Sequence, residues 1–467
     1  MIDISSARVV VTIPPQEWFG GQDRRSAFAI TRQLEERFGS TFYQFDTTPF
    51  IRDEVRAQRD AIAELRAFRP HLAITLANAG YGLVCAVKGK HGWANVFTDM
   101  LNIPLMMLWD HGLFAFPNLI SWRFGSQTGG PNAGVLRRIS SVIDAPLMHH
   151  YPIDSGQVTE MRRIGMLHSD KVNTIPSMAY KPFLDYGSQP TARRYCNDVA
   201  FAGNILLSDQ HQPKSDQSVR GRCRDAVLAA QRANPTIPAW KFLVREVEAL
   251  SPADRAQAHL EYDDADFWPF ANEVVAVHCQ RQGRVQTLSS LKRRVAFYGE
   301  FADAEGVARL KEFEFIDYKG CADFSTELPQ VYAESRILVD MTNAAFINNC
   351  STKPICCFAA GGFSLFDYRP DPIAHLGDDI EKVMFRNFDE LNAKVDYFLT
   401  HESEREALAD HLKDVIRRKC DFADSVYEPA ARILAQQAER GGVWSSLRDA
   451  LSRAFRGGAS RPLRIEE

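Results

Sequence analysis

The sequence lacks a long apolar stretch, a strong excess of charge and any Cys-x-x-Cys pair. A helix that spans a bilayer needs about 20 mostly apolar residues, and no unbroken apolar run in the chain approaches that length. The start of the chain, MIDISSARVVVTI, lacks the basic segment and long apolar core of a signal peptide. A net charge of −4 gives no electrostatic reason to expect nucleic acid as a partner. We therefore expect a cytoplasmic protein that binds no nucleic acid.

The cysteines do not form the pattern of a disulfide scaffold or of a metal site. Nine of them are scattered from Cys85 to Cys420, whereas a small secreted scaffold carries a dense and even set. Cys356 and Cys357 are adjacent within an apolar run, which fits reduced core thiols better than metal ligands. This distribution favours a thiol-reducing compartment.

The acidic and histidine residues show no convincing metal-binding pattern either. No Asp-x-Asp pair follows a predicted strand, and we interpret the acidic run at 263–266 as the solvated start of a helix. His149 and His150 are neighbours in the sequence, and on a strand successive side chains point to opposite faces. The sequence therefore predicts neither a metal nor a cofactor.

Alternating strand-like and helix-like segments fill the first part of the chain. A length of 467 residues favours two or three domains. Strands are predicted at 8–13, 41–45, 71–77, 104–109 and 172–175, and helices at 22–38, 52–68, 93–101 and 155–164. This β-α-β order is typical of a parallel sheet with helices on both faces.

A polar, turn-rich segment at 186–194 is followed by a second β/α alternation. Strands are predicted at 198–202, 294–298, 314–318, 337–341 and 363–366, and helices at 325–332, 353–360, 389–399, 402–422 and 425–437. The sequence therefore predicts an α/β fold with two Rossmann-like domains facing across a cleft. We place the domains at 1–185 and 198–440, a helical insertion in the second domain at about 222–291, and a tail at 441–467.

Ligands of open α/β sheets bind beyond the carboxyl ends of the strands. In the second domain, Gly203 and Asn204 end the first strand, and the following loop leads to Arg222. A glycine lets a ligand approach the backbone, and cations near a helix start suit a diphosphate. The alternative is that Lys214, Arg220 and Arg222 belong to an ordinary solvated surface loop.

The next strand ends in this domain offer further polar groups. An amide-rich loop ends at Asn349, and Ser351 or Thr352 is a candidate N-cap for the helix that contains Lys353. Free N–H groups at such a helix start can bind a diphosphate. An ordinary β-loop-α-β unit that returns through Gly361 is the alternative.

Several segments of the second domain resemble a known family. The ordered series DVAFAGN, VAFYGEF, ELPQVYAESRILVDM, CCFAAGGF and FDELNAKVDYFLTHESERE is similar to the C-terminal half of CgeB-like glycosyltransferases, spore-maturation proteins of the GT-B architecture. The resemblance covers roughly 198–433, and IPLMMLWDHG and RRIGMLHSDKVNTIPSMAYKPF extend it loosely into the first domain. It implies a UDP-, GDP- or TDP-linked sugar donor in the second domain. The acceptor, a protein, glycan or small molecule, would lie at the first.

The residues that we predict to bind the donor lie at or after the ends of four strands. They are Gly203, Asn204, Arg222, Tyr298, Gly299, Lys319, Gly320, Asn349, Ser351, Thr352, Lys353, Cys356 and Gly361. The family usually has Arg-x-Phe-Glu, where the Glu holds the donor, but this chain has Lys353 and Cys356 at the Arg and Glu positions. A thiol cannot replace a carboxylate as an acceptor of strong hydrogen bonds. A catalytically inactive protein that binds a glycan or nucleotide is therefore the alternative function, and an epimerase is a third.

Catalysis by such an enzyme requires a base near the acceptor. Asp110 and His111 follow the strand at 104–109, and either could take a proton from an acceptor hydroxyl. A structural hydrogen bond is the alternative role for His111. Loops after the first and third strands give the acceptor-side candidates Gly20, Gly21, Asn78 and Gly80.

The tail contains a short basic amphipathic pattern. Trp444, Leu447, Leu451 and Phe455 recur at three- and four-residue steps with arginines between them. Such a helix at 443–456 could make peripheral contact with an anionic membrane. Packing onto the protein or a partner subunit is the alternative that we favour.

Overall fold

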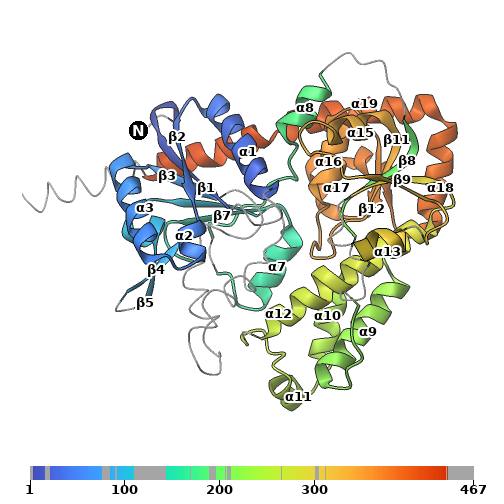
Figure 1. Cartoon of the computed structure of the whole chain (residues 1–467), viewed down its shortest axis with the longest axis horizontal. Coiled ribbons are helices and arrows are strands. Elements are labelled where there is room, and N and C mark those ends of the chain that lie inside the picture. Colours follow the sequence, from blue (N-terminus) through green and yellow to red (C-terminus); the bar gives the residue numbers. More distant parts are fainter. Residues whose placement is uncertain are drawn as a thin grey trace, which may run out of the picture.

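The computed structural model contains two separate parallel sheets, each flanked by helices (Figure 1). The residues that the structure describes are 4–15, 22–75, 85–89, 92–109, 144–168, 170–188, 196–205, 207, 212–264, 266–299, 304–310, 312–437 and 439. The predicted fold class, an α/β protein with two Rossmann-like sheets, is confirmed. No helix among these described residues has the length and apolar character to cross a membrane.

The first sheet has five parallel strands. In spatial order they are β2 (Thr41–Asp46), β1 (Arg8–Ile13), β3 (Leu72–Thr75), β6 (Leu105–Trp109) and β7 (Met148–Pro152). Its helical segments are η1 (Ile4–Ser6), α1 (Gln22–Phe38), α2 (Thr48–Ile51), α3 (Val55–Phe68), α7 (Ser155–Arg163) and α8 (Lys181–Tyr186). The apolar runs of β1, β3, β6 and β7 are buried almost throughout, as strands covered on both faces should be.

The second sheet has six parallel strands. In spatial order they are β10 (Ile316–Gly320), β9 (Val295–Tyr298), β8 (Asn197–Ala202), β11 (Ser335–Asp340), β12 (Ser364–Asp367) and β13 (Met384–Phe385). Its flanking helices are α14 (Ala304–Leu310), α15 (Leu328–Glu334), α16 (Thr352–Ala359), α17 (Pro370–Leu376), η7 (Asp378–Val383), α18 (Phe388–Thr400) and α19 (Glu402–Lys419). Counted along the chain this order is 3-2-1-4-5-6, the dinucleotide-binding arrangement.

Several predicted elements differ from the structure. Residues 92–101 form strand β5 (Gly92–Asn95), paired antiparallel with β4 (Ala86–Gly89), and then the π-helix η3 (Val96–Met100). The predicted strand at 172–175 is a single bridge between His150 and Val172. Helix α15 begins three residues later than predicted, because the Asp323 carboxylate accepts the backbone N–H groups of Ser325 and Thr326 and holds them in a turn.

The predicted insertion is helical and has its own aromatic core. It consists of α9 (Val219–Ala233), α10 (Ala239–Glu248), α11 (Pro252–Gln257), α12 (Phe267–Asn272), the π-helix η6 (Glu273–Cys279) and α13 (Gln280–Ser290). The Trp240 and Trp268 rings stack with centroids 5.9 Å apart. Trp240 also donates its Nε1–H to Glu160 of α7 at 3.1 Å. We call each sheet with its flanking helices a unit, so the insertion packs against the first unit as well as the second (Figure 1).

The last described helix returns from the second sheet to the first. Residues 422–437 are helical. We predicted them as part of the second domain, which we placed at 198–440. Asp421 pairs with Ala179, and the Tyr427 ring packs edge-on against Phe38 of α1 with centroids 5.3 Å apart. Figure 1 shows this helix, in red, beside the blue elements of the first sheet. The apolar side of this helix faces α1. The helix therefore packs with the first unit.

Candidate functional site

The strand order of the second sheet reverses between β8 and β11. Connections from these two neighbours run to opposite sides, which leaves a crevice at their carboxyl ends. Gly203 follows β8 directly, and Asp340 is the last residue of β11. We call the five residues that meet here the switch-point cluster: Gly203, Arg284, Asp340, Ser351 and Lys353.

Asp340 is the buried acidic group of the switch-point cluster. Its side chain is 1% exposed. It accepts a hydrogen bond from the Ser351 hydroxyl at 2.7 Å and pairs with the Lys353 ammonium at 3.3 Å. Ser351 occupies the N-cap position of α16, as predicted, but its hydroxyl binds Asp340 instead of a backbone N–H. Asp340 thus fixes the start of α16 to the end of β11.

Lys353 is held beside the backbone at the end of β8. A Cβ atom at Gly203 would lie 2.6 Å from Lys353 Nζ, and Gly203 has φ +151°. Only glycine combines this backbone conformation with such a close ammonium group. Burial lowers the pKa of Lys353, the neighbouring Arg284 lowers it further, and Asp340 opposes both effects. The side chain nevertheless keeps 26% of its surface exposed, so the ammonium can reach a ligand.

Arg284 brings a second cation from the helical insertion. It lies on α13 and donates from NH1 to the carbonyl oxygen of Asn204. Its buried Nε finds no hydrogen-bond partner among the described residues. Burial lowers the pKa of Arg284, and Asp340 partly offsets that effect. Among the described residues of the cluster, these two cations are influenced by a single carboxylate, Asp340, which leaves an excess of positive charge in a partly buried site.

Such an excess of positive charge suits an anion. A guanidinium and an ammonium bind phosphate oxygens through charge-assisted hydrogen bonds. The backbone N–H groups at the start of α16 point to the same edge, where the helix dipole also favours negative charge. The switch-point cluster can therefore bind a diphosphate.

Some predicted donor-binding residues lie in or beside this cluster. Gly203 and Lys353 touch, Asn204 contacts Arg284, and Thr352 is the first residue of α16. Gly299 follows β9 and donates its N–H to the Gly320 carbonyl at 2.9 Å, so both glycines lie at the same sheet edge.

Three predicted donor-binding residues are buried or remote, which corrects their assignment. Asn349 is 1% exposed and donates its amide to the Ile153 carbonyl. Cys356 is 2% exposed, and its thiol faces the Met178 carbonyl at 3.9 Å. Gly361 lies beyond the opposite end of α16, about 12 Å from the start of an eight-residue helix. None of the three faces the switch-point cluster.

Other predicted donor-binding side chains are engaged elsewhere. Arg222 donates to the Gln217 carbonyl at 2.6 Å, and Lys319 pairs with Asp317 at 2.8 Å on its own strand. The Tyr298 hydroxyl accepts from Asn197, at the beginning of β8. These contacts keep the three side chains out of the switch-point cluster.

Several predicted residues lie outside the described part of the chain. They are the base candidates Asp110 and His111, the acceptor-side residues Gly20, Gly21, Asn78 and Gly80, and the amphipathic segment 443–456. Their roles stay predictions. Gly20 and Gly21 follow β1, and Asn78 and Gly80 follow β3, the two strands between which the order of the first sheet reverses.

Sequence reasoning missed Arg284 and Asp340. Asp340 carries a recognisable pattern, a lone carboxylate at the end of an apolar strand. Arg284 carries none, because it lies in a helical stretch where a cation is ordinarily a solvated residue. Only the fold of the insertion brings it to the end of β8.

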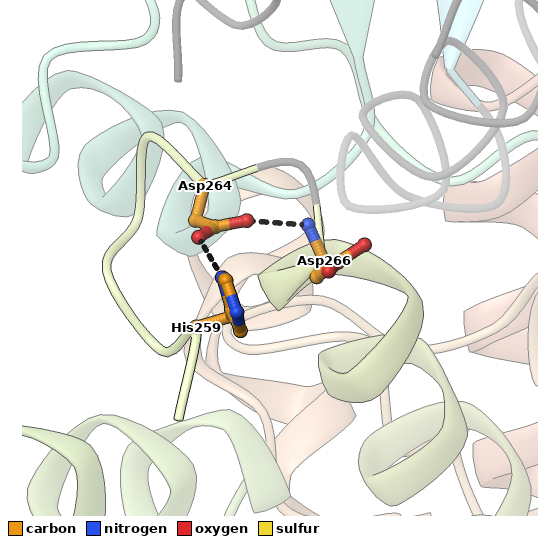
Figure 2. Close-up of side chains that lie close together, drawn as sticks. All are labelled: His259, Asp264 and Asp266. Atoms are coloured by element: carbon orange, nitrogen blue, oxygen red, sulfur yellow. Dashed lines mark hydrogen bonds and ion pairs between the residues drawn. The ribbon is translucent and has the colours of Figure 1, made fainter. Parts of the chain in front are cut away.

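A group of three possible metal ligands lies at the start of α12. His259, Asp264 and Asp266 each place a ligand atom within 4.8 Å of the others. Figure 2 shows Asp264 between the other two residues: it bonds His259 Nδ1 at 2.8 Å and accepts the Asp266 backbone N–H at 2.9 Å. These bonds hold the turn that precedes α12, in agreement with the predicted helix start.

A cavity of about 450 Å³ lies between α1, α8 and the segment before α15. Gln33, Tyr180 and Phe324 contribute to its wall. Its cations, Arg32 and Lys181, are matched by the carboxylates Glu36 and Asp185. The cavity therefore lacks the positive excess of the switch-point cluster.

The match to a known protein family concerns the second half of the chain. The family model of glycosyl transferase-like proteins matches residues 281–428. No curated protein matches the sequence. The matched segment contains Arg284, Asp340, Ser351 and Lys353, four of the five residues of the switch-point cluster.

Solved structures resemble the whole chain only loosely. A glycosyltransferase from Rickettsia africae ESF-5 is 10% identical, with 93% of this chain and 97% of that chain covered and a TM-score of 0.48. Anabaena Alr3699/HepE in complex with UDP and glucose is 10% identical, with 94% and 100% covered and a TM-score of 0.49. Sucrose-phosphate synthase from Thermosynechococcus elongatus is 10% identical, with 95% and 100% covered and a TM-score of 0.48.

The family match and the cluster coincide in the same part of the second sheet. The match confirms the predicted glycosyltransferase class for this part of the chain. Residues 281–428 form a glycosyl transferase-like domain.

Proposed function

We propose that the chain is a GT-B glycosyltransferase that moves a sugar from a nucleotide-sugar to a protein, glycan or small-molecule acceptor. The observation that carries the proposal is the switch-point cluster, where Lys353 pairs with Asp340 and Arg284 lies within the electrostatic influence of this carboxylate, the one acidic group among the cluster's described residues. The positive excess lies where open α/β sheets bind nucleotides. The ordered motifs further support membership of the CgeB-like group.

The roles of the residues follow from the charge that develops during transfer. When the bond between the sugar and the diphosphate breaks, negative charge grows on the leaving phosphate oxygens. Lys353 and Arg284 bind and neutralise that charge, and Asp340 keeps Lys353 in place. Gly203 lets the diphosphate approach the backbone at the end of β8. The base then takes the proton of the acceptor hydroxyl, and Asp110 and His111 are the candidates for this step.

We also propose that the transfer needs no metal ion. A divalent cation prefers several oxygen ligands, whereas the switch-point cluster contains one carboxylate already engaged by Ser351 and Lys353. The two side-chain cations supply the charge that a metal would otherwise provide. Turnover that continues in excess EDTA supports this proposal, and turnover restored only by Mn²⁺ or Mg²⁺ contradicts it.

One observation favours a second function, nucleotide or glycan binding without catalysis. The position at which the resembling family has its donor-holding Glu is occupied by Cys356, which is buried against the Met178 carbonyl. The sugar hydroxyls of a donor would then lack that carboxylate.

A ligand screen followed by a turnover assay tests both functions. Thermal unfolding is measured with UDP-, GDP- and TDP-sugars and with the free nucleotides. A ligand present at 100 times its Kd stabilises the protein by about 2.7 kcal/mol. Binding together with slow release of nucleoside diphosphate supports the enzyme, and clear binding without turnover supports the binding protein. The absence of any thermal shift contradicts both the enzyme and a nucleotide-binding protein.

A further inference from the structure

The loop between β11 and α16 is held by the first unit of the protein. We call residues 342–350 the latch loop. Asp154, which precedes α7 in the first unit, is 1% exposed and accepts the Ile347 N–H at 2.6 Å and the Asn348 N–H at 3.2 Å. A longer bond of 3.4 Å reaches the Asn349 N–H. One carboxylate thus binds three consecutive N–H groups from a segment almost 200 residues away.

The contact is reciprocal, because a second carboxylate reaches in the other direction. Asp371, at the start of α17, accepts the Ser155 N–H at 2.8 Å and the Ser155 hydroxyl at 2.6 Å. Its own N–H donates to the Asn348 carbonyl at 2.8 Å. Each unit therefore contributes one carboxylate that binds the backbone of the other.

The two segments also pack too closely for larger residues. A Cβ atom at Gly156 would lie 2.6 Å from Ile347. The Gln157 amide donates to the Ala345 carbonyl at 2.7 Å. Farther along α7, Glu160 accepts from Trp240 of the insertion, and Arg163 at the far end donates to Glu248 at 2.7 Å. Helix α7 is therefore fixed at both ends, and its first turn is a rigid support for the latch loop.

The latch loop leads directly into the switch-point cluster. It begins one residue after Met341, which follows Asp340, and it ends at Cys350, which precedes Ser351. The Ser177 hydroxyl of the first unit donates to the Cys350 carbonyl at 3.0 Å. The position of Ser351 and Lys353 relative to Asp340 consequently depends on how the first unit holds this loop.

We propose that Asp154 is a positioning residue, which holds the latch loop so that Ser351 and Lys353 are already arranged for the donor diphosphate. The part of this inference that concerns the donor rests on the proposed function. The hold on the loop does not, because it is a property of the protein without ligand. An ordered loop lowers the entropic cost of binding.

The burial of Asp154 supports a role beyond helix capping. Capping of α7 requires only the bond from the Gln157 N–H to Asp154 Oδ1, at 3.0 Å. A serine or asparagine could make that bond without burying a charge. Burial raises the pKa of Asp154 to about 6, and the nearby Asp371 raises it as well. The three N–H groups of the latch loop are therefore partners of this buried carboxyl group that capping of α7 does not require.

The test compares Asp154→Asn with the matched control Asp144→Asn. Asparagine keeps the shape of Asp154 but replaces one acceptor oxygen with an amide that cannot accept. Asp144 also accepts a backbone N–H in the first unit, from His168 at 3.1 Å, but it is only half-buried. Asp371→Asn removes the opposite half of the latch and serves as a second variant if Asp154→Asn fails to fold.

The first readout needs no ligand. In hydrogen–deuterium exchange of the full chain, Asp154→Asn and Asp371→Asn should each speed exchange in a peptide covering 342–353 by at least about 10-fold, the factor that about 1.4 kcal/mol of local opening produces. Asp144→Asn should leave this peptide unchanged. Unchanged exchange in both latch variants overturns the proposed hold on the loop.

The second readout separates positioning from general stability. With the nucleotide-sugar among UDP-glucose, GDP-mannose and dTDP-glucose that the wild type binds, Asp154→Asn should raise KM about 10-fold and leave kcat within about threefold. A variant that merely folds less well would lower kcat at an unchanged KM. That second pattern, or an unchanged KM, overturns the positioning role. If the wild type binds none of the three donors, the proposed function fails, while the exchange experiment still decides the hold on the loop.

Discussion

Replacement of Lys353 by methionine removes the charge of the switch-point cluster that is best placed for a ligand. A hydrogen bond to a charged group contributes about 1.5–3 kcal/mol, so loss of the Lys353–phosphate contact should weaken binding about 10- to 150-fold. The change also leaves Asp340 without its ammonium partner. Breaking a fully buried ion pair costs about 3–5 kcal/mol. Lys353 is 26% exposed, so we expect a smaller loss in the free energy of unfolding.

Calorimetric titration with nucleoside and nucleoside diphosphate isolates the phosphate contact. For the base that the wild type accepts, Lys353→Met should weaken binding of the nucleoside diphosphate about 10- to 150-fold. It should change binding of the nucleoside by less than about threefold. Lys353→Arg, the residue of the resembling family, should retain most of the affinity because it keeps the charge. Lys413→Met, a matched change near Gly361 beyond the opposite end of α16, should have no effect. Equal losses for nucleoside and diphosphate would refute the assignment of Lys353 to the phosphates.

Three further predictions use other residues of the two sites. Arg284→Gln should weaken binding of the nucleoside diphosphate about 10-fold or more and leave binding of the nucleoside unchanged, because the lost guanidinium makes charge-assisted hydrogen bonds to phosphate. Equal titration curves for variant and wild type would contradict this. Gly203→Ala should cost about 1–3 kcal/mol of stability from its backbone conformation and should also displace Lys353. The control Gly377→Ala has φ +100° and free space around the added Cβ, so it should lower the melting temperature without weakening the donor. Since burial raises the pKa of Asp154 to about 6, its stabilising contribution is fully present below about pH 4 and lost as pH rises through 6. The free energy of unfolding of the wild type, relative to Asp154→Asn, should thus fall by about 3 kcal/mol between pH 3 and pH 8 in denaturant titrations; a flat difference would contradict this.

Local sequence patterns predicted the sheets well because buried parallel strands are continuous apolar runs. The strands at 8–13 and 198–202 follow from this pattern, and their glycine and polar ends correctly indicated the carboxyl edge. The hairpin of β4 and β5 escaped prediction, since its residues 86–95 alternate weakly and lack a strong turn pair.

The switch-point cluster was predictable only where its chemistry is local. Ser351 and Lys353 were found because a helix start has a recognisable N-cap and early proline. Asn349 was assigned to the donor because an amide-rich loop after a strand resembles a binding loop. Its actual partner, Ile153, lies 196 positions away in the first unit, and no local pattern reports such a contact. Arg284 escaped for the same reason, since its place depends on how the insertion packs.

The most direct test of the central claim is a crystal structure of the chain grown with the nucleotide-sugar that it binds. The account predicts a diphosphate at the carboxyl ends of β8 and β11, with phosphate oxygens within about 3 Å of Lys353 Nζ and of the Arg284 guanidinium. A nucleotide bound elsewhere, such as in the cavity beside α8, with Lys353 still paired only to Asp340, would contradict it.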